Sequence, residues 1–328
     1  MNVLGIESTA HTLSIGIVRE GKVLSNVIDM YRSGNEGLIP RKLADHHANV
    51  FSDVLVKSLK DAGIAMEDVD LIAFSQGPGI GAPLSVGVGG AKYLASRFDK
   101  PLVGVNHCYA HVKISEHLCR MHDPLVLYVS GGNSQILRAD SDGYYHVLGE
   151  TLDMGIGNLF DSFARAIEMK EAHGSALAKL AEGGKYVELP YTVKGMNLVF
   201  SGLLTAAEKA AKKDRNAAHQ RDVAYSLMET SFAMTCEVTE RALFLTRKKH
   251  LIACGGVAQN RRLQQMLQTM CEEDEVEFGV APDEFNRDNG AMIAYAGSLL
   301  FKRYGPTPPG KCDPITNYRI DRMKEIMG

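Results

Sequence analysis

Residues 125–148, LVLYVSGGNSQILRADSDGYYHVL, decide the fold that this chain is expected to adopt. They predict a buried strand (Leu125–Ser130), a glycine turn, a second strand (Gln135–Ala139) and, after a polar turn, a third strand (Tyr144–Leu148). The stretch 3–29, VLGIESTAHTLSIGIVREGKVLSNVID, repeats this order of strand, loop, strand, turn and strand. Alternating helix and strand patterns follow in both halves. The sequence therefore predicts an α/β protein made of two similar units in tandem, with a cleft between them.

The expected division of the chain follows from this duplication. The first half is expected to cover residues 1–123, with a long helix from about Arg41 to Ala62. The second half is expected to cover residues 124–303 and to end on a helix over 289–303. The remaining residues, 304–328, are rich in proline and are expected to return to the first half as a tail.

The composition limits the class of protein. The chain has 328 residues, of which 45% are hydrophobic and 23% charged, close to the average of globular proteins. No stretch approaches the roughly 18–20 apolar residues that a membrane helix needs, and no signal sequence is visible. The six cysteines are scattered without paired spacing, which favours reduced thiols in the cytoplasm over a disulfide framework.

The net charge of −3 indicates that the molecule as a whole does not attract nucleic acid. Two local basic groups are candidates for contacts with a nucleic acid. One is the helix face with Lys212, Lys213 and Arg215, and the other is the run Arg247–Lys249. Both patterns are also typical of solvated helix ends, and this simpler interpretation is favoured for each of them.

Three loops at strand ends indicate a phosphate site. They are Glu7–Thr12, Ser130–Asn133 and Gly255–Asn260, the last two with paired glycines. A backbone without Cβ atoms approaches a phosphate closely and turns its N–H groups toward the anion. One such loop is usually only a turn, but three in matched halves favour a binding site. None has the glycine spacing of the Walker or Rossmann motifs, so those folds are disfavoured.

Two histidines, His107 and His111, stand four residues apart in an expected helix. This spacing places them on one helix face, where they can bind one metal ion, although a surface helix that carries two histidines is the simpler interpretation. Candidates for a third ligand are Asp288, which would otherwise cap the next helix, and Tyr128, which would otherwise pack in the core. Asp161 is a candidate for ribose binding or a solvated acid in a first helical turn.

The residues that carry this chemistry stand in longer motifs. The motifs are NHCYAHVKI (106–114), YVSGGNSQIL (128–137), GETLDMGIGNLFDSFAR (149–165), KGMNLVFSGLLTAA (194–207), ACGGVAQNRRL (253–263) and DNGAMIAYAG (288–297). They resemble the universal tRNA threonylcarbamoyltransferase family, which includes the catalytic subunit of the archaeal and eukaryotic KEOPS complex and the bacterial protein TsaD. The resemblance covers nearly the whole chain, and the sequences of the motifs are similar to those of the archaeal and eukaryotic branch.

The resemblance implies a fold and a reaction. The fold would be the two-lobed fold of actin, sugar kinases and Hsp70 (ASKHA), with a metal ion and an adenine nucleotide, ATP or threonylcarbamoyl-AMP, in the cleft. The reaction would transfer the threonylcarbamoyl group of threonylcarbamoyl-AMP to N6 of the adenosine beside the anticodon, in tRNAs that read codons beginning with A. The metal would polarise the mixed-anhydride carbonyl for attack by the adenine amine. No covalent nucleophile with an adjacent base is visible, so direct transfer is expected.

The resemblance also implies a set of site residues. The metal ligands would be His107, His111, Tyr128 and Asp288, with iron as the expected ion and zinc as the alternative. The substrate and phosphate loop would be formed by Tyr128, Val129, Ser130, Gly131 and Gly132. The ribose and adenine contacts would come from Asp161, Gly174 and Asn260, with Gly255 and Gly256 beside the base.

Two positions depart from the family pattern. Ala178 stands where family members carry a glutamate that is expected to hold the ribose, so a charge-assisted hydrogen bond of roughly 1.5–3 kcal/mol is missing. Leu38 stands in the sequence Leu38-Ile39-Pro40 where an arginine is common in an early loop, and Arg41 follows as a possible substitute.

The expected partners are tRNA, a small kinase-like ATPase subunit, and the small dimerising and regulatory subunits of the KEOPS complex. Two other functions are compatible with the same fold. An ATP-dependent small-molecule kinase would need a carboxylate base beside a sugar hydroxyl. A non-catalytic assembly module switched by a nucleotide would bind ATP and show no activity that depends on tRNA.

Overall fold

The computed structural model describes residues 1–32 and 37–327, which form two compact units. Unit 1 consists of Met1–Leu118 and the chain from Pro282 onward, and unit 2 consists of Cys119–Ala281. Each unit is built around a five-stranded sheet. Among the described residues, no helix is long and apolar enough to cross a membrane. All six cysteines are free thiols, as the sequence predicts.

The sheet of unit 1 has the strand order β3-β2-β1-β4-β5. Strands β1, β2 and β3 form an antiparallel meander, and β4 and β5 continue the sheet parallel to β1. The strands are β1 (Asn2–Glu7), β2 (Thr12–Arg19), β3 (Lys22–Met30), β4 (Leu71–Gly77) and β5 (Leu102–Asn106). The helices are α1 (Pro40–Ala62), α2 (Gly81–Phe98), α3 (His107–Cys119), α9 (Asp283–Asn286), α10 (Gly290–Tyr304) and α11 (Met323–Met327).

The sheet of unit 2 repeats this topology in the order β8-β7-β6-β11-β12, read from its meander. Its parallel strands β11 and β12 again follow an antiparallel meander of three strands. The strands are β6 (Leu125–Val129), β7 (Ser134–Ala139), β8 (Tyr145–Glu150), β11 (His250–Cys254) and β12 (Glu277–Val280), with a short hairpin of β9 (Val193–Lys194) and β10 (Asn197–Leu198). The helices are α4 (Ile156–Ala166), α5 (Gly174–Ala181), α6 (Ser201–Lys213), α7 (Ala217–Thr246) and α8 (Arg261–Glu273). The duplication that the sequence predicts is confirmed, because both meanders fall on the stretches 3–29 and 125–148.

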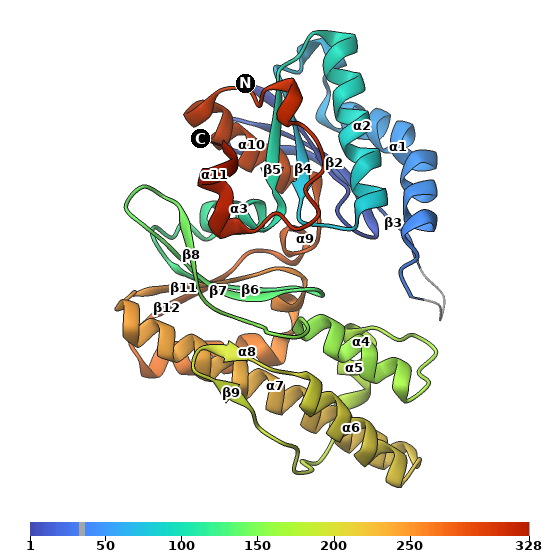
Figure 1. Cartoon of the computed structure of the whole chain (residues 1–328), viewed down its shortest axis with the longest axis vertical. Coiled ribbons are helices and arrows are strands. Elements are labelled where there is room, and N and C mark those ends of the chain that lie inside the picture. Colours follow the sequence, from blue (N-terminus) through green and yellow to red (C-terminus); the bar gives the residue numbers. More distant parts are fainter. Residues whose placement is uncertain (33–36, 328) are drawn as a thin grey trace. The chain divides into compact units, whose positions relative to one another are not determined.

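In unit 1, α1 and α2 cover one face of the sheet and α10 covers the other (Figure 1). Helix α1 begins at Pro40 and ends at Ala62, and it is capped by Gly63, whose left-handed conformation (φ 67°) suits a residue without a side chain. In unit 2, α4 and α7 lie below the sheet in the view of Figure 1. Their apolar side chains belong to one core, in which the rings of Phe160 and Phe232 pack edge to face at 5.5 Å. Each unit therefore has its own core.

The helix α10 belongs to unit 1, whereas the division expected from the sequence placed residues 289–303 in the second half. The reason is a backbone contact that three glycines allow. A Cβ atom on Gly5 would lie 2.2 Å from the carbonyl oxygen of Gly290, and one on Gly290 would lie 2.2 Å from the nitrogen of Gly16. The helix therefore lies directly on β1 and β2.

The end of the chain follows the edge of the same unit. The backbone N–H of Thr307 donates to the carbonyl of Leu102, at 2.8 Å, and that of Ile315 donates to the carbonyl of Gln76, at 2.7 Å. The side-chain amide of Asn106 donates to the carbonyl of Tyr318, also at 2.8 Å. These bonds connect the last segment to β4 and β5, beside the start of α3.

Candidate functional site

Two of the predicted metal ligands lie at the start of α3, where the chain leaves β5. Asn106, the last residue of β5, accepts a hydrogen bond from the backbone N–H of Tyr109 at 3.0 Å. This bond caps the first turn of α3, because the first N–H groups of a helix have no partner within it. His107 and His111 are then one turn apart, and both rings are buried.

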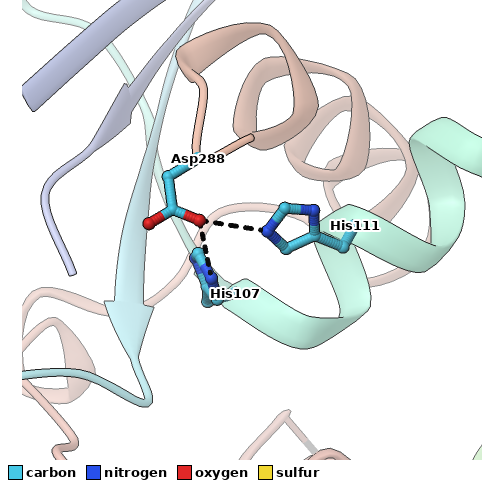
Figure 2. Close-up of side chains that lie close together, drawn as sticks. All are labelled: His107, His111 and Asp288. Atoms are coloured by element: carbon cyan, nitrogen blue, oxygen red, sulfur yellow. Dashed lines mark hydrogen bonds and ion pairs between the residues drawn. The ribbon is translucent and has the colours of Figure 1, made fainter. Parts of the chain in front are cut away.

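Asp288 approaches these two rings from the segment before α10 (Figure 2). Its Oδ1 atom lies 3.3 Å from Nε2 of His111 and 3.5 Å from Nε2 of His107. The ligand atoms of the three residues all lie within 4.8 Å of one another. The structure therefore brings together three of the four predicted metal ligands.

The cap of α10 is Asn289, whose side chain accepts from the backbone N–H of Met292 at 2.9 Å. Its amide also donates to the carbonyl of Arg287 at 2.7 Å, which fixes the loop on the other side of Asp288. Asp288 does not cap the helix, so the simpler interpretation of this residue is wrong. Its carboxylate is turned toward the histidines instead.

Glu7 is a further residue of this group, and the sequence alone did not identify it as such. Its side chain is completely buried, and Oε2 accepts a hydrogen bond from Nδ1 of His107 at 2.9 Å. Oε1 accepts from the backbone N–H of Thr9 at 2.7 Å and from its hydroxyl at 2.5 Å. A carboxylate can only accept, so Nδ1 of His107 carries a proton, and the ring presents Nε2 toward Asp288. This arrangement of carboxylate, histidine and open nitrogen is typical of metal sites.

The signal for Glu7 was present in the sequence. Glu7 ends β1 as its one acid, directly after the apolar run Val3–Ile6, and β1 and β5 are parallel members of the same sheet. The carboxyl ends of parallel strands lie at one edge, so Glu7 and His107 were bound to lie near each other once this strand order was known.

The charges in this group are strongly coupled. Burial acts to lower the pKa of His107, but the carboxylates of Glu7 and Asp288 outweigh it and raise the pKa to about 9. Burial lowers the pKa of His111, with the hydrogen bond to Asp288 acting against it. Burial acts to raise the pKa of Asp288, but the charge of His107 and the hydrogen bond from His111 outweigh it, so that this pKa lies well below its usual range. A divalent cation would take the place of the proton on Nε2 of His107 between the same groups.

The donor set suits such a cation. Two imidazole nitrogens and one carboxylate oxygen form the ligand set of many iron and zinc sites. Tyr128, the fourth predicted ligand, lies in β6 of unit 2 and is 2% exposed. Its part in metal binding stays a prediction.

In unit 2 the two predicted glycine turns lie at one edge of the sheet. Strands β6 and β11 are parallel neighbours, with Tyr128 opposite Cys254, so the turns that follow them are adjacent. Gly255 has a left-handed φ of 95°, and a Cβ atom on it would lie 2.4 Å from the carbonyl oxygen of Val129. Only glycine allows the two turns to approach this closely.

The start of α4 holds the first turn in place. The N–H of Gly157 donates to the carbonyl of Ser130 at 3.2 Å, and that of Asn158 donates to the carbonyl of Gly131 at 2.9 Å. Gly132 and Gly256 are exposed, and among the described residues no heavy atom outside their two chain neighbours and the nearby backbone of their own helix lies within 4 Å of where their Cβ atoms would be. The backbone is therefore open to a ligand at these two glycines.

The side chains predicted to hold a nucleotide have structural contacts of their own. Oδ1 of Asp161 accepts from the backbone N–H of Gly174 at 2.8 Å, at the first residue of α5. Oδ1 of Asn260 caps α8 by accepting from Arg262 and Leu263 at 2.9 and 3.2 Å. Ala178, on α5, packs partly buried against the core of unit 2. The role of these residues toward a nucleotide stays a prediction.

The repeated topology places the protein in a structural class that is also found among solved structures. Full-length HypF, in a phosphate- and nucleotide-bound form, matches with a TM-score of 0.64 at 14% identity, over 93% of this chain and 47% of that chain. HypF of T. kodakarensis matches with a TM-score of 0.62 at 15% identity, over 92% and 48%. The chain therefore has the two-lobed ASKHA-type fold that the resemblance implied.

Comparison of sequences identifies the family. The model of the TsaD family, described as tRNA N6-adenosine threonylcarbamoyltransferase, matches residues 22–295. A protein of Thermococcus sibiricus with this name is 52% identical over 303 residues, which are 92% of both chains. The chain belongs to the TsaD family. It is also 45% identical over 325 residues to a probable bifunctional tRNA threonylcarbamoyladenosine biosynthesis protein of Methanothermobacter thermautotrophicus, of which it covers 60%.

Proposed function

We propose that this protein transfers the threonylcarbamoyl group of threonylcarbamoyl-AMP to N6 of the adenosine beside the anticodon of tRNA. The observation that carries the proposal is the group of His107, His111 and Asp288, within 4.8 Å of one another, in a chain of the TsaD family. The relatives that share about half of its residues are named for this reaction.

His107, His111 and Asp288 would hold one divalent metal ion, with Tyr128 as the proposed fourth ligand. Iron is the expected ion and zinc the alternative, because both accept nitrogen and oxygen ligands. When bound, such an ion acts as a Lewis acid on a carbonyl or phosphoryl oxygen. Glu7 holds a proton of His107 on Nδ1 and orients the ring, so that Nε2 is the nitrogen that would bind the metal ion.

The two glycine turns that follow β6 and β11 in unit 2 would hold the AMP part of the substrate. Gly132 and Gly256 are exposed residues, and we propose that their backbone N–H groups donate to a phosphate, as such turns do in other nucleotide-binding proteins. The loop from Tyr128 to Gly132 would contact the phosphate, Asp161, Gly174 and Asn260 the ribose and adenine, and Gly255 the side of the base. Solved structures of the same fold support a nucleotide here, because HypF is described in a phosphate- and nucleotide-bound form and the activator of the 2-hydroxyisocaproyl-CoA dehydratase from Clostridium difficile with bound ADPNP.

The transfer is written as one substitution at the carbamoyl carbon. The bond from adenine N6 to this carbon forms as the bond from the carbon to the phosphate oxygen of AMP breaks, and N6 loses a proton. Positioning and electrostatic stabilisation account for such a step without a covalent enzyme intermediate. The N–H groups that bind the phosphate also stabilise AMP as the leaving group.

We propose a cytoplasmic protein that acts with tRNA, a small kinase-like ATPase, and small dimerising and regulatory subunits of the KEOPS type. The bifunctional relatives support a larger assembly, because the chain matches only 60% of the length of one such protein. The rest of that protein is available for a second activity.

The test is a reconstituted transfer reaction. The purified chain is incubated with threonylcarbamoyl-AMP and unmodified tRNA, with and without the candidate subunits, and nucleoside mass spectrometry detects threonylcarbamoyladenosine. His111→Ala should abolish product, whereas His117→Ala should retain it, because His117 lies on the same helix but contacts the carbonyl of Gly21. An absence of product in every combination, with ATP binding intact, would reject the transferase in favour of a kinase or an assembly module.

A further inference from the structure

The C-terminal half of α6 carries a group of exposed cations, which we call the α6 basic face. It consists of Lys209, Lys212 and Lys213 on the helix and Arg215 directly after it. The three lysines are spaced three and four residues apart, so they lie on the same side of the helix. None of the four side chains has an ion-pair partner among the residues that the structure describes.

Packing of the opposite side of α6 fixes this orientation. Leu203, Ala207 and Ala211, spaced by four residues, are buried in the core of unit 2. The lysines are therefore directed outward. Like charges at these spacings destabilise a helix, and an anionic partner would remove this repulsion.

Two acids accompany the face, Glu208 and Asp214. Asp214 accepts a hydrogen bond from the backbone N–H of Asn216 at 2.9 Å, which directs its carboxylate toward the start of α7. Glu208 forms no ion pair in the described part of the chain. Four cations against two acids leave the face positive on a protein whose net charge is −3.

The run Arg247–Lys249, the other basic candidate, has a different environment. Nζ of Lys248 forms an ion pair with Asp123. The run lines a cavity of about 270 Å³ together with Asp274, which belongs to the acidic stretch 272–275. The pKa of Glu240 is raised by burial and by the carboxylates of Asp274, Glu273 and Glu237, which shows how dense the negative charge is here. These carboxylates offset the run, so a polyanion is not attracted to it.

We infer that the α6 basic face binds the phosphate backbone of tRNA. The inference rests on the proposed function, which makes tRNA the substrate. Lysine ammonium groups bind phosphates as point charges, and such contacts give affinity and orientation without reading sequence. The C-terminal end of α6 lies away from the sheet of unit 2 (Figure 1). The α6 basic face therefore contacts a part of the tRNA that is remote from the two glycine turns on this sheet, and the contact positions the tRNA.

The experiment measures the salt dependence of tRNA binding to the full chain. Each lost phosphate contact lowers the slope of log Kd against log salt by about 0.7–0.9. The variant Lys209→Gln/Lys213→Gln should lower the slope by about 1.4–1.8. The variant Arg247→Gln/Lys249→Gln, which loses the same charge from the same unit, should keep the slope of the unaltered chain. Lys209→Arg/Lys213→Arg should keep it as well, because the charge is retained.

Three results would overturn the inference. The first is binding of tRNA to the unaltered chain that does not depend on salt. The second is an unchanged slope in the Lys209→Gln/Lys213→Gln variant. The third is an equal decrease of the slope in both glutamine variants, which would indicate a general charge effect. In the transfer assay the α6 variant should raise KM for tRNA and leave kcat unchanged. The binding assay does not depend on the transfer reaction. If the transfer reaction fails but the slope is reduced in the α6 variant alone, the proposed function is rejected, whereas the inference that the α6 basic face binds tRNA stands.

Discussion

Replacing Glu7 by glutamine is expected to weaken metal binding about ten- to hundredfold, the usual cost of losing a residue that orients a metal ligand. The buried carboxylate accepts from His107 through one oxygen and from Thr9 through the other. A glutamine has only one accepting oxygen, so it satisfies one side alone. If this oxygen faces Thr9, the amide donates to Nδ1 of His107 and moves the ring proton to Nε2, the atom that should bind the metal. If it faces His107, the two donors of Thr9 lose their acceptor.

The magnitude follows from the same contacts. A hydrogen bond to a charged group contributes about 1.5–3 kcal/mol and one between neutral groups about 0.5–1.5 kcal/mol. The difference of about 1–1.5 kcal/mol corresponds to roughly tenfold in affinity. The forced change of tautomer adds to this loss, which explains the upper part of the range.

The assay is a titration of the chelator-treated chain with Fe²⁺ or Zn²⁺ in competition with a coloured chelator. Glu116→Gln is the matched control, because Glu116 is paired with Lys113 on the same helix and lies outside the metal group. Melting curves of both variants show whether the fold is intact. A Glu7→Gln protein that melts normally and binds metal within twofold of the unaltered chain would refute the reasoning.

Three further predictions concern stability and reactivity. Gly290→Ala should lower the free energy of unfolding by about 3 kcal/mol, because its Cβ atom would lie 2.2 Å from a backbone nitrogen of β2. Gly89→Ala on α2 should raise it by about 0.5–1 kcal/mol, because among the described residues no heavy atom outside its chain neighbours and the nearby backbone of its own helix lies within 4 Å of the new Cβ atom. Equal melting temperatures of the two variants would contradict this prediction. Burial and the neighbouring charge of His46 lower the pKa of His47 from 6.5 to about 4. The unfolded chain therefore takes up this proton first, so stability should be complete above pH 7 and fall between pH 6.5 and 4, by about 1–2 kcal/mol after solvent screening, and denaturant titrations of His47→Gln should lack this part of the decrease. Burial raises the pKa of Cys236 and Cys271 to about 12, so both should react slowly with a disulfide reagent at pH 8 and rapidly in denaturant; rapid labelling of the folded chain would count against this burial.

Local patterns in the sequence were sufficient to predict the strands of both meanders and the long helix from Arg41 to Ala62. Alternating apolar residues and turn signals decide such elements within a few residues of chain. The position of α10 could not be predicted in this way. It depends on glycines 5, 16 and 290, which meet only after the chain has folded.

In the candidate site, too, local spacing predicted some residues, whereas others could be assigned only from contacts between distant parts of the chain. The spacing of His107 and His111 predicted that they share a helix face, which the structure confirms. Asp288 and Asn289 are both good caps for a helix, and only the folded loop shows that Asn289 takes this place. Glu7 was assigned to a loop because its partner stands a hundred residues further along the chain.

Unit 1 is divided in the sequence, and the residues of its proposed metal group are divided with it. Glu7, His107 and His111 precede unit 2, whereas Asp288 follows it together with the helix that covers the first sheet. During synthesis the ribosome therefore makes all of unit 2 before the third ligand emerges. A chain that stops early has two histidines and an uncovered sheet, but no complete metal group. Binding of the proposed metal ion would thus be a mark of chains that have been synthesised beyond unit 2.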